Sequence, residues 1–190
     1  MEGSQDVRTI RPRPSGRERL FGTDEIIVSK TDAKGIITYA NEVFLRVSAY
    51  DEADVIGQPH NLIRHPDMPR AVFGLMWEVI ASGREIFAFV LNLASDGDHY
   101  WVLAHVTPSF GPDGAIIGYH SNRRLPDRPA VAQIAALYAE LRAVERRGGT
   151  PREALAASSE RLTGILAAQG ATYDDFLWSL VPAASVAGAR

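Results

Sequence analysis

Three long apolar segments, separated by very short turns, constrain the fold of this chain more than any other feature. Residues 86–93, 99–110 and 115–124 are rich in β-branched and aromatic side chains, which favour strands. The segments SDGD (95–98) and GPDG (111–114) between them have the composition of tight turns. Because such short connections join antiparallel neighbours, the sequence predicts a three-stranded meander.

Two shorter strands and a helical region precede this meander. Residues 26–28 and 36–39 are apolar runs on either side of DAKG, a pattern typical of a hairpin. Between the hairpin and the meander, residues 42–82 show helical spacing of apolar side chains, with glycines where helices would end. This order of two strands, helices and three strands predicts an α+β domain whose sheet has five antiparallel strands.

The first strand of the meander has no polar face. Side chains alternate between two faces along a strand, and large apolar residues occur here on both. We therefore expect helices of the domain or a ligand to cover one face, and the C-terminal helices or another chain to cover the other. The first face holds Ile86, Ala88, Val90 and Asn92, and the second, with its neighbours on the next strand, holds Phe87, Phe89, Leu91, Leu93, Trp101 and Leu103.

Composition divides the chain into three parts. Residues 1–22 combine arginines with prolines and few apolar side chains, which is typical of a flexible arm. Residues 23–127 hold the strands and helices described above and form the predicted α+β domain. Residues 128–190 contain three amphipathic segments and form a predicted helical extension, whose last helix has Thr172 and Asp175 at the spacing of a capping box.

Charge and cysteine content exclude several classes of protein. The net charge of −3 over 190 residues gives no basic surface for nucleic acid. The absence of cysteine removes disulfides, thiol nucleophiles and cysteine-based zinc sites. No apolar run approaches the roughly 18 residues that a membrane span needs, and the N-terminus lacks the apolar core of a secretory signal. We therefore expect a cytoplasmic protein with no direct membrane insertion.

The segment NLIRHPDMPRAVFGLMW (61–77) concentrates polar groups directly before a helix with an aromatic face. Two interpretations of Arg64, His65 and Asp67 stay open. Asp67 caps the helix and Arg64 pairs with it, or the segment forms one wall of a ligand pocket. Asn92 is the polar residue on an otherwise apolar strand face, so it needs a buried partner from a ligand or from the backbone.

The strand order, together with GQPHNLIRHPDMPRAVFGLMW and DGDHYWV, resembles the PAS domain of bacterial aerotaxis receptors, which hold FAD non-covalently. The resemblance covers residues 24–124 and implies a PAS fold, a five-stranded antiparallel sheet with helices on one face, followed here by the helical extension. Two positions depart from the family, since Ile86 stands in place of a tryptophan and Ala88 in place of a glycine. The residues that the resemblance implies to line or support the cofactor site are Asn41, Arg64, His65, Asp67, Phe73, Trp77 and Asn92.

The resemblance implies a sensor that reports redox or oxygen status in energy taxis. Its implied partners are a chemoreceptor or another signalling protein, and a second copy of the chain in a homodimer. The second, wholly apolar face of the strand at 86–93 would transmit the signal.

The residues themselves argue against catalysis and leave two alternative functions open. The chain has no phosphate-binding loop, nucleophile elbow or HExxH motif, so we expect neither an enzyme nor a metal site. Two alternatives to a flavin sensor stay open. One is a cofactor-free PAS adaptor, which the departure at Ile86 favours. The other is a haem gas sensor, whose candidate axial ligands are His60, His65, His99, His105 and His120.

Overall fold

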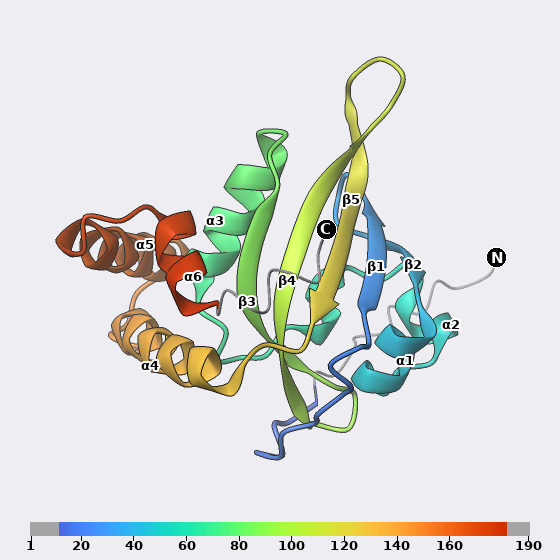
Figure 1. The fold of residues 1–190 in the computed structure, drawn as a ribbon, viewed down its shortest axis with the longest axis horizontal. Coiled ribbons are helices and arrows are strands. Elements are labelled where there is room, and N and C mark those ends of the chain that lie inside the picture. The colour runs from blue at the N-terminus through green and yellow to red at the C-terminus, as the bar shows by residue number, and fades with distance from the viewer. Residues whose placement is uncertain (1–11, 182–190) are drawn as a thin grey trace.

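A five-stranded antiparallel sheet forms the centre of the computed structural model, which describes residues 12–181 (Figure 1). Its strands are β1 (Ile27–Asp32), β2 (Ile37–Ala40), β3 (Ile86–Leu93), β4 (His99–Phe110) and β5 (Ile116–Arg124). They lie in the order β2-β1-β5-β4-β3, so the hairpin joins the meander through β5. Gly97 and Gly114 in the two tight turns have φ values of 92° and 78°, which glycine adopts without strain. The predicted five-stranded antiparallel sheet is confirmed.

The predicted helical region forms four short elements between β2 and β3. They are α1 (Glu42–Ser48), α2 (Glu52–Val55), the 3-10 helix η1 (His60–Ile63) and α3 (Arg70–Ala81). Helix α1 packs on β1, and α3 packs on β3 and β4. Asn41 caps α1 by accepting a hydrogen bond from the backbone N–H of Phe44 at 2.9 Å. These elements therefore stand along one face of the sheet, and α3 is the one that faces its long strands.

The C-terminal extension forms the three predicted helices. They are α4 (Arg128–Glu145), α5 (Pro151–Ala168) and α6 (Tyr173–Leu180), and they gather on the β3 side of the sheet (Figure 1). The predicted capping box of Thr172 and Asp175 is present at the start of α6. Among residues 12–181, none of the helices has both the length and the apolar character that crossing a membrane requires.

The outer face of β3 is covered by these C-terminal helices. The Tyr138 hydroxyl of α4 donates a buried hydrogen bond to the Phe89 carbonyl at 2.6 Å, and its ring lies 5.8 Å from that of Trp101. Trp178 of α6 packs edge-on against Phe87, with 4.7 Å between ring centroids. Of the two coverings expected for this face, the structure shows the chain's own helices. They also protect β3, which is an edge strand.

The described part of the predicted flexible arm is held against the β3–β4 turn. The Ser15 N–H donates to the Gly97 carbonyl at 2.8 Å, and Arg17 Nε lies 3.0 Å from Asp98 Oδ1. Arg19 pairs with both Asp96 and Asp98. The two aspartates of the turn thus provide counter-charges for Arg17 and Arg19, and the flexibility of the arm stays a prediction. Residues 1–11 lie outside the described residues.

The start of α3 is capped from a distant helix. The Arg70 N–H donates to the Glu145 carboxylate of α4 at 2.6 Å, and Arg142 Nη1 donates to the same carboxylate at 2.6 Å. Asp67, which the sequence offered as the cap, has a mostly exposed side chain and makes no such bond. That interpretation of Asp67 is wrong. The acceptor that α3 needs comes from a residue 75 positions away, and it ties the extension to the α+β domain.

Candidate functional site

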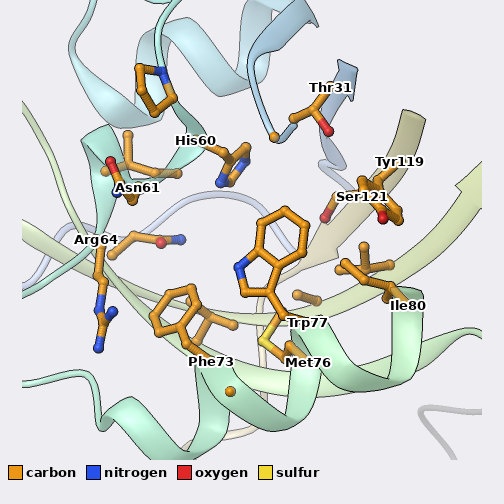
Figure 2. Close-up of a pocket in the computed structure, with 18 of the residues that line it drawn as sticks. Thr31, His60, Asn61, Arg64, Phe73, Met76, Trp77, Ile80, Tyr119 and Ser121 are labelled. Atoms are coloured by element: carbon orange, nitrogen blue, oxygen red, sulfur yellow. The ribbon is translucent and has the colours of Figure 1, made fainter. Parts of the chain in front are cut away.

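A cavity of about 550 Å³ lies between the sheet and the segment that runs from η1 through α3 (Figure 2). This volume is in the range of small-molecule and cofactor sites, which is roughly 300–1,000 Å³. Apolar side chains of β3 and β4 line one side. The other side is aromatic and apolar, and Figure 2 shows the Trp77 indole projecting from α3 toward His60. The lining residues on these two sides include Val90, Ala104, Val106, Phe73, Met76, Trp77 and Ile80.

The charged residues around the cavity are all cationic. Among the described residues, no aspartate or glutamate lines it, although the whole chain carries a net charge of −3. A cavity lined by one sign of charge and low-dielectric walls attracts ligands of the opposite sign. The cationic lining residues are Lys34, Arg64, Arg70, Arg123 and Arg152. The site is therefore suited to a ligand that is anionic and partly aromatic.

Arg123 is the cation that lies deepest. It belongs to β5 and is 3% exposed, and burial lowers its pKa to about 10, so that it stays charged at neutral pH. One nitrogen, Nη2, donates to Ser29 Oγ at 2.9 Å and to His60 Nε2 at 2.6 Å. The other, Nη1, has no hydrogen-bond partner among the described residues, and no carboxylate there forms an ion pair with it. A buried cation in this state is costly unless a ligand supplies the missing acceptor.

His60 is held in its neutral form beside Arg123. Burial lowers the pKa of His60 to about 3, and the charge of Arg123 adds to the effect. Because Nε2 faces the guanidinium donor, it is the unprotonated nitrogen, and the Ser29 hydroxyl lies 3.1 Å from the same atom. The three side chains form a rigid polar corner with one unused donor.

Asn92 supplies a second unused donor. It is 2% exposed and lines the cavity from β3, and its Nδ2 has no hydrogen-bond partner among the described residues. Its backbone pairs with that of Arg64 in an isolated antiparallel bridge. Of the two partners expected for the side chain, the described backbone does not accept from this nitrogen, and a ligand acceptor stays a prediction.

Four of the seven site residues implied by the resemblance line the cavity. They are Arg64, Phe73, Trp77 and Asn92. The Arg64 guanidinium stacks over the Phe73 ring with 4.2 Å between its carbon and the ring centroid. The Trp77 ring meets Tyr119 of β5 edge-on at 5.5 Å. The structure therefore brings these residues together around one volume.

The other three residues lie outside the cavity lining. Asn41 caps α1, and its Oδ1 also accepts from the Val28 N–H at 3.0 Å. His65 is buried behind the wall, where its Nδ1 accepts from the Asp67 N–H at 3.0 Å. Asp67 faces solvent. The arrangement of His65 and Asp67 fits support of the segment that carries Arg64, Asn41 joins α1 to β1, and a direct role of the three at a cofactor stays a prediction.

Sequence reasoning missed the polar corner. It treated His60 only as a possible haem ligand, and it did not single out Ser29 or Arg123. A signal was present, because Tyr119, Ser121 and Arg123 alternate along the last strand and so share one face. Ile86, the departure from the family, is buried but does not line the cavity.

Acidification is expected to destabilise the protein through His60. The folded chain keeps this histidine neutral down to about pH 3, whereas the unfolded chain protonates it near pH 6.5. Unfolding therefore takes up a proton between pH 6.5 and pH 3. The contribution of His60 to the free energy of unfolding is highest above pH 6.5 and falls as the pH drops through this window. Between pH 7 and pH 5 the loss is about 2 kcal/mol from this one group.

Urea denaturation at several pH values measures this effect. The matched variant is His60→Gln, whose amide oxygen still accepts from Arg123 but does not titrate. Its stability is expected to fall less steeply over the same range. The lowered pKa values of His65 and His120 act in the same direction in both proteins. Parallel pH profiles for the two proteins would contradict the assignment.

Comparison with known proteins identifies the family of this chain. The family model described as "PAS fold" matches residues 25–121, just over half of the chain. The chain is 41% identical over 120 residues to the aerotaxis receptor of Escherichia coli K12, a match that covers 63% of this chain and 24% of that protein. It is 31% identical over 99 residues to the nitrogen fixation regulatory protein of Klebsiella pneumoniae, covering 52% and 20%. The chain thus matches about a quarter or less of the length of these relatives.

A solved structure shares the same fold. The light-state LOV domain of the blue-light photoreceptor Aureochrome1 superposes with a TM-score of 0.51 at 24% identity, covering 62% of this chain and 91% of that one. The fold expected from the resemblance and the likeness to aerotaxis receptors are both confirmed. The chain belongs to the PAS-fold family, as a sensor domain followed by a C-terminal helical extension.

Proposed function

We propose that this protein is a cytoplasmic PAS sensor that binds FAD non-covalently and reports redox or oxygen status to a chemotaxis signalling partner. The observation that carries the proposal is the pair of buried, unused donors on Arg123 and Asn92, which face a cationic and aromatic cavity. Buried polar groups in native proteins are nearly always paired, so these donors indicate a polar ligand. The likeness to the aerotaxis receptor makes FAD the first choice among such ligands.

The residues of the cavity fit the chemical parts of a flavin. Arg123 and Asn92 would hold a polar edge of the ring system, and Phe73, Trp77 and Tyr119 would cover its apolar surface. The exposed cations at the mouth would hold phosphate. Bound flavin supplies redox chemistry in which the charge and protonation of its ring change. Arg123, which stays cationic, and His60, which stays neutral, would respond to that change through their shared hydrogen bonds.

The path from the cavity to a partner runs through β3. Asn92 lies on the inner face of this strand, and Phe89, three residues earlier, accepts the hydrogen bond from Tyr138 of α4. A change at Asn92 would therefore reach the C-terminal helices, which cover the outer face. In this proposal those helices, rather than the bare strand face, present the signal to a chemoreceptor, another signalling protein or the second subunit of a homodimer.

The alternatives are less well supported. A haem ligand from the cavity would have to be His60, whose Nε2 is already engaged by Arg123. A cofactor-free adaptor gives no reason for a buried cation without a counter-charge among the described residues, because such a charge destabilises the fold and an apolar side chain in its place would not. Catalysis is not part of the proposal, because the sequence carries none of the nucleophile or phosphate-loop motifs considered above.

An absorption spectrum of the purified protein tests the proposal. After expression with added riboflavin we expect bands near about 380 and 450 nm that dithionite bleaches, as for an oxidised flavin. Extraction and chromatography should then identify FAD. A Soret band would overturn the proposal in favour of haem. A colourless protein that takes up no flavin on reconstitution would favour the adaptor.

A further inference from the structure

Part of the cavity lies outside the PAS domain. The N-terminal end of α5 contributes Pro151, Arg152 and Leu155 to the lining, beside Arg70 and Gly74 of α3. The two helices approach closely, because a Cβ added to Gly74 would lie 3.0 Å from Leu155 Cδ1. This glycine allows α5 to seat its first turn at the mouth of the cavity. The extension is therefore part of the wall of the site as well as a cover for the sheet.

We infer that α5 completes the ligand site, with Arg152 and Arg70 binding the phosphate group of a flavin nucleotide at the cavity mouth. The inference rests on the proposed function and adds a specificity to it. The site would prefer phosphate-bearing flavins to riboflavin, and it would form fully only when the C-terminal extension is docked.

The charges of these two arginines are available for a ligand. Both side chains are exposed, and among residues 12–181 neither forms an ion pair. The carboxylates near these arginines are engaged elsewhere, and Asp67, three residues before Arg70, lies 4.0 Å from Arg142. Glu145 accepts from Arg142 and from the Arg70 backbone, and Glu153 accepts from the Thr150 N–H in the capping box of α5. An incoming phosphate would therefore meet cations that no neighbouring acid neutralises.

The buried end of the cavity gives independent support for an elongated ligand. Asn92 Nδ2 and Arg123 Nη1 need acceptors at the floor, whereas Arg70 and Arg152 stand at the rim. Apolar and aromatic side chains also line the cavity. A flavin nucleotide has polar ring atoms at one end, an aromatic ring system and an anionic phosphate beyond it. The lining offers buried donors, an aromatic surface and exposed cations for these three parts.

Linkage makes the extension responsive to the ligand. If a docked α5 raises the affinity for a phosphate-bearing flavin, the bound flavin must stabilise the docked α5 by the same factor. Riboflavin, which lacks the phosphate, would not have this effect through Arg152. Ligand occupancy would thus be reported by the position of the extension, the part of the chain that covers β3.

Titration of flavins into the full-length apoprotein tests the inference, with flavin fluorescence as the readout. The variant is Arg152→Gln, and the matched control is Arg147→Gln, which removes the same charge from an exposed residue that does not line the cavity. We expect Arg152→Gln to weaken FAD binding about tenfold, the loss of one charge-assisted contact, and to leave riboflavin binding unchanged. The control should bind both as the unaltered chain does.

Each contrary outcome has a distinct meaning. Equal losses for FAD and riboflavin would show that Arg152 acts on the fold, and unchanged FAD affinity would show that it touches no phosphate. Either result overturns the inference and leaves the proposed function standing. If the unaltered chain binds no flavin, both fail. Hydrogen exchange gives a second readout, since FAD, but not riboflavin, should slow exchange of the α5 amides by way of Arg152.

Discussion

Replacing Arg123 with methionine is expected to weaken FAD binding about 100-fold and to leave the flavin-free protein at least as stable as the unaltered chain. The guanidinium is 3% exposed and has no carboxylate partner among the described residues, so the folded apoprotein bears its desolvation cost. Methionine fills a similar volume without a charge. Ser29 and His60, which lose a donor, remain 3.1 Å apart and can pair with each other.

Two measurements on the same preparation separate the roles of Arg123. Urea denaturation without flavin gives the stability, and fluorescence titration gives the affinity. Arg124→Met is the matched control, because Arg124 is the next residue of β5 and its side chain is exposed and does not line the cavity. It should alter neither quantity. A loss of more than about 2 kcal/mol of stability in Arg123→Met, with FAD affinity retained, would show that the buried cation serves the fold instead.

The expected opposition between stability and binding is a physical signature of a site. Replacing a core residue that serves only packing lowers the stability of the protein. Replacing a ligand-binding residue that the apoprotein keeps in an unfavourable state leaves the stability unchanged or raises it. Asn92 belongs to the same class, because its buried Nδ2 has no hydrogen-bond partner within residues 12–181. The Tyr138 hydroxyl belongs to the opposite class, because its buried bond to Phe89 is already made.

Local chemistry made the fold predictable from the sequence. Short Asp-Gly turns, β-branched runs and helix-stop glycines act within a few residues, so the strands, the meander and the capping box of Thr172 could be derived without a structure. Asn92 could be identified in the same way, because side chains alternate between the two faces of a strand and Asn92 is the polar residue on an otherwise apolar face. Arg64, Phe73 and Trp77 are predicted through the resemblance to the family, and all three lie in one continuous sequence motif.

The remaining features depend on contacts between distant residues. His60 and Arg123 are 63 positions apart, and Arg70 and Glu145 are 75 apart, so neither pairing has a local signature. The ion pairs of Arg19 likewise involve Asp96 and Asp98, which lie far along the chain. The sequence also left open what covers the outer face of β3, because an apolar face shows that a cover exists without showing which chain provides it.

The Leu91→Asp variant tests which chain covers the outer face of β3. It is expected to lose about 3–5 kcal/mol of unfolding free energy. Leu91 is 8% exposed on the outer face of β3 and pairs in register with Trp101, whose ring meets Tyr138 of α4. An aspartate there would bury a carboxylate among apolar groups without a partner. Ile117→Asp is the control, since Ile117 on β5 is 60% exposed and the same change should cost within about 0.5 kcal/mol.

The location of the damage distinguishes the two possible covers. If the chain's own helices cover the face, Leu91→Asp should speed proteolysis and hydrogen exchange in α4 and α6 of the isolated protein, at concentrations where no dimer forms. If a partner covers it, the isolated variant should match the Ile117→Asp control, and the difference should appear only when the partner is added. The buried bond from Tyr138 to Phe89 favours the first result, because it closes the edge of β3 within one chain. A signal from the cavity would then have to move α4 before it reached any other protein.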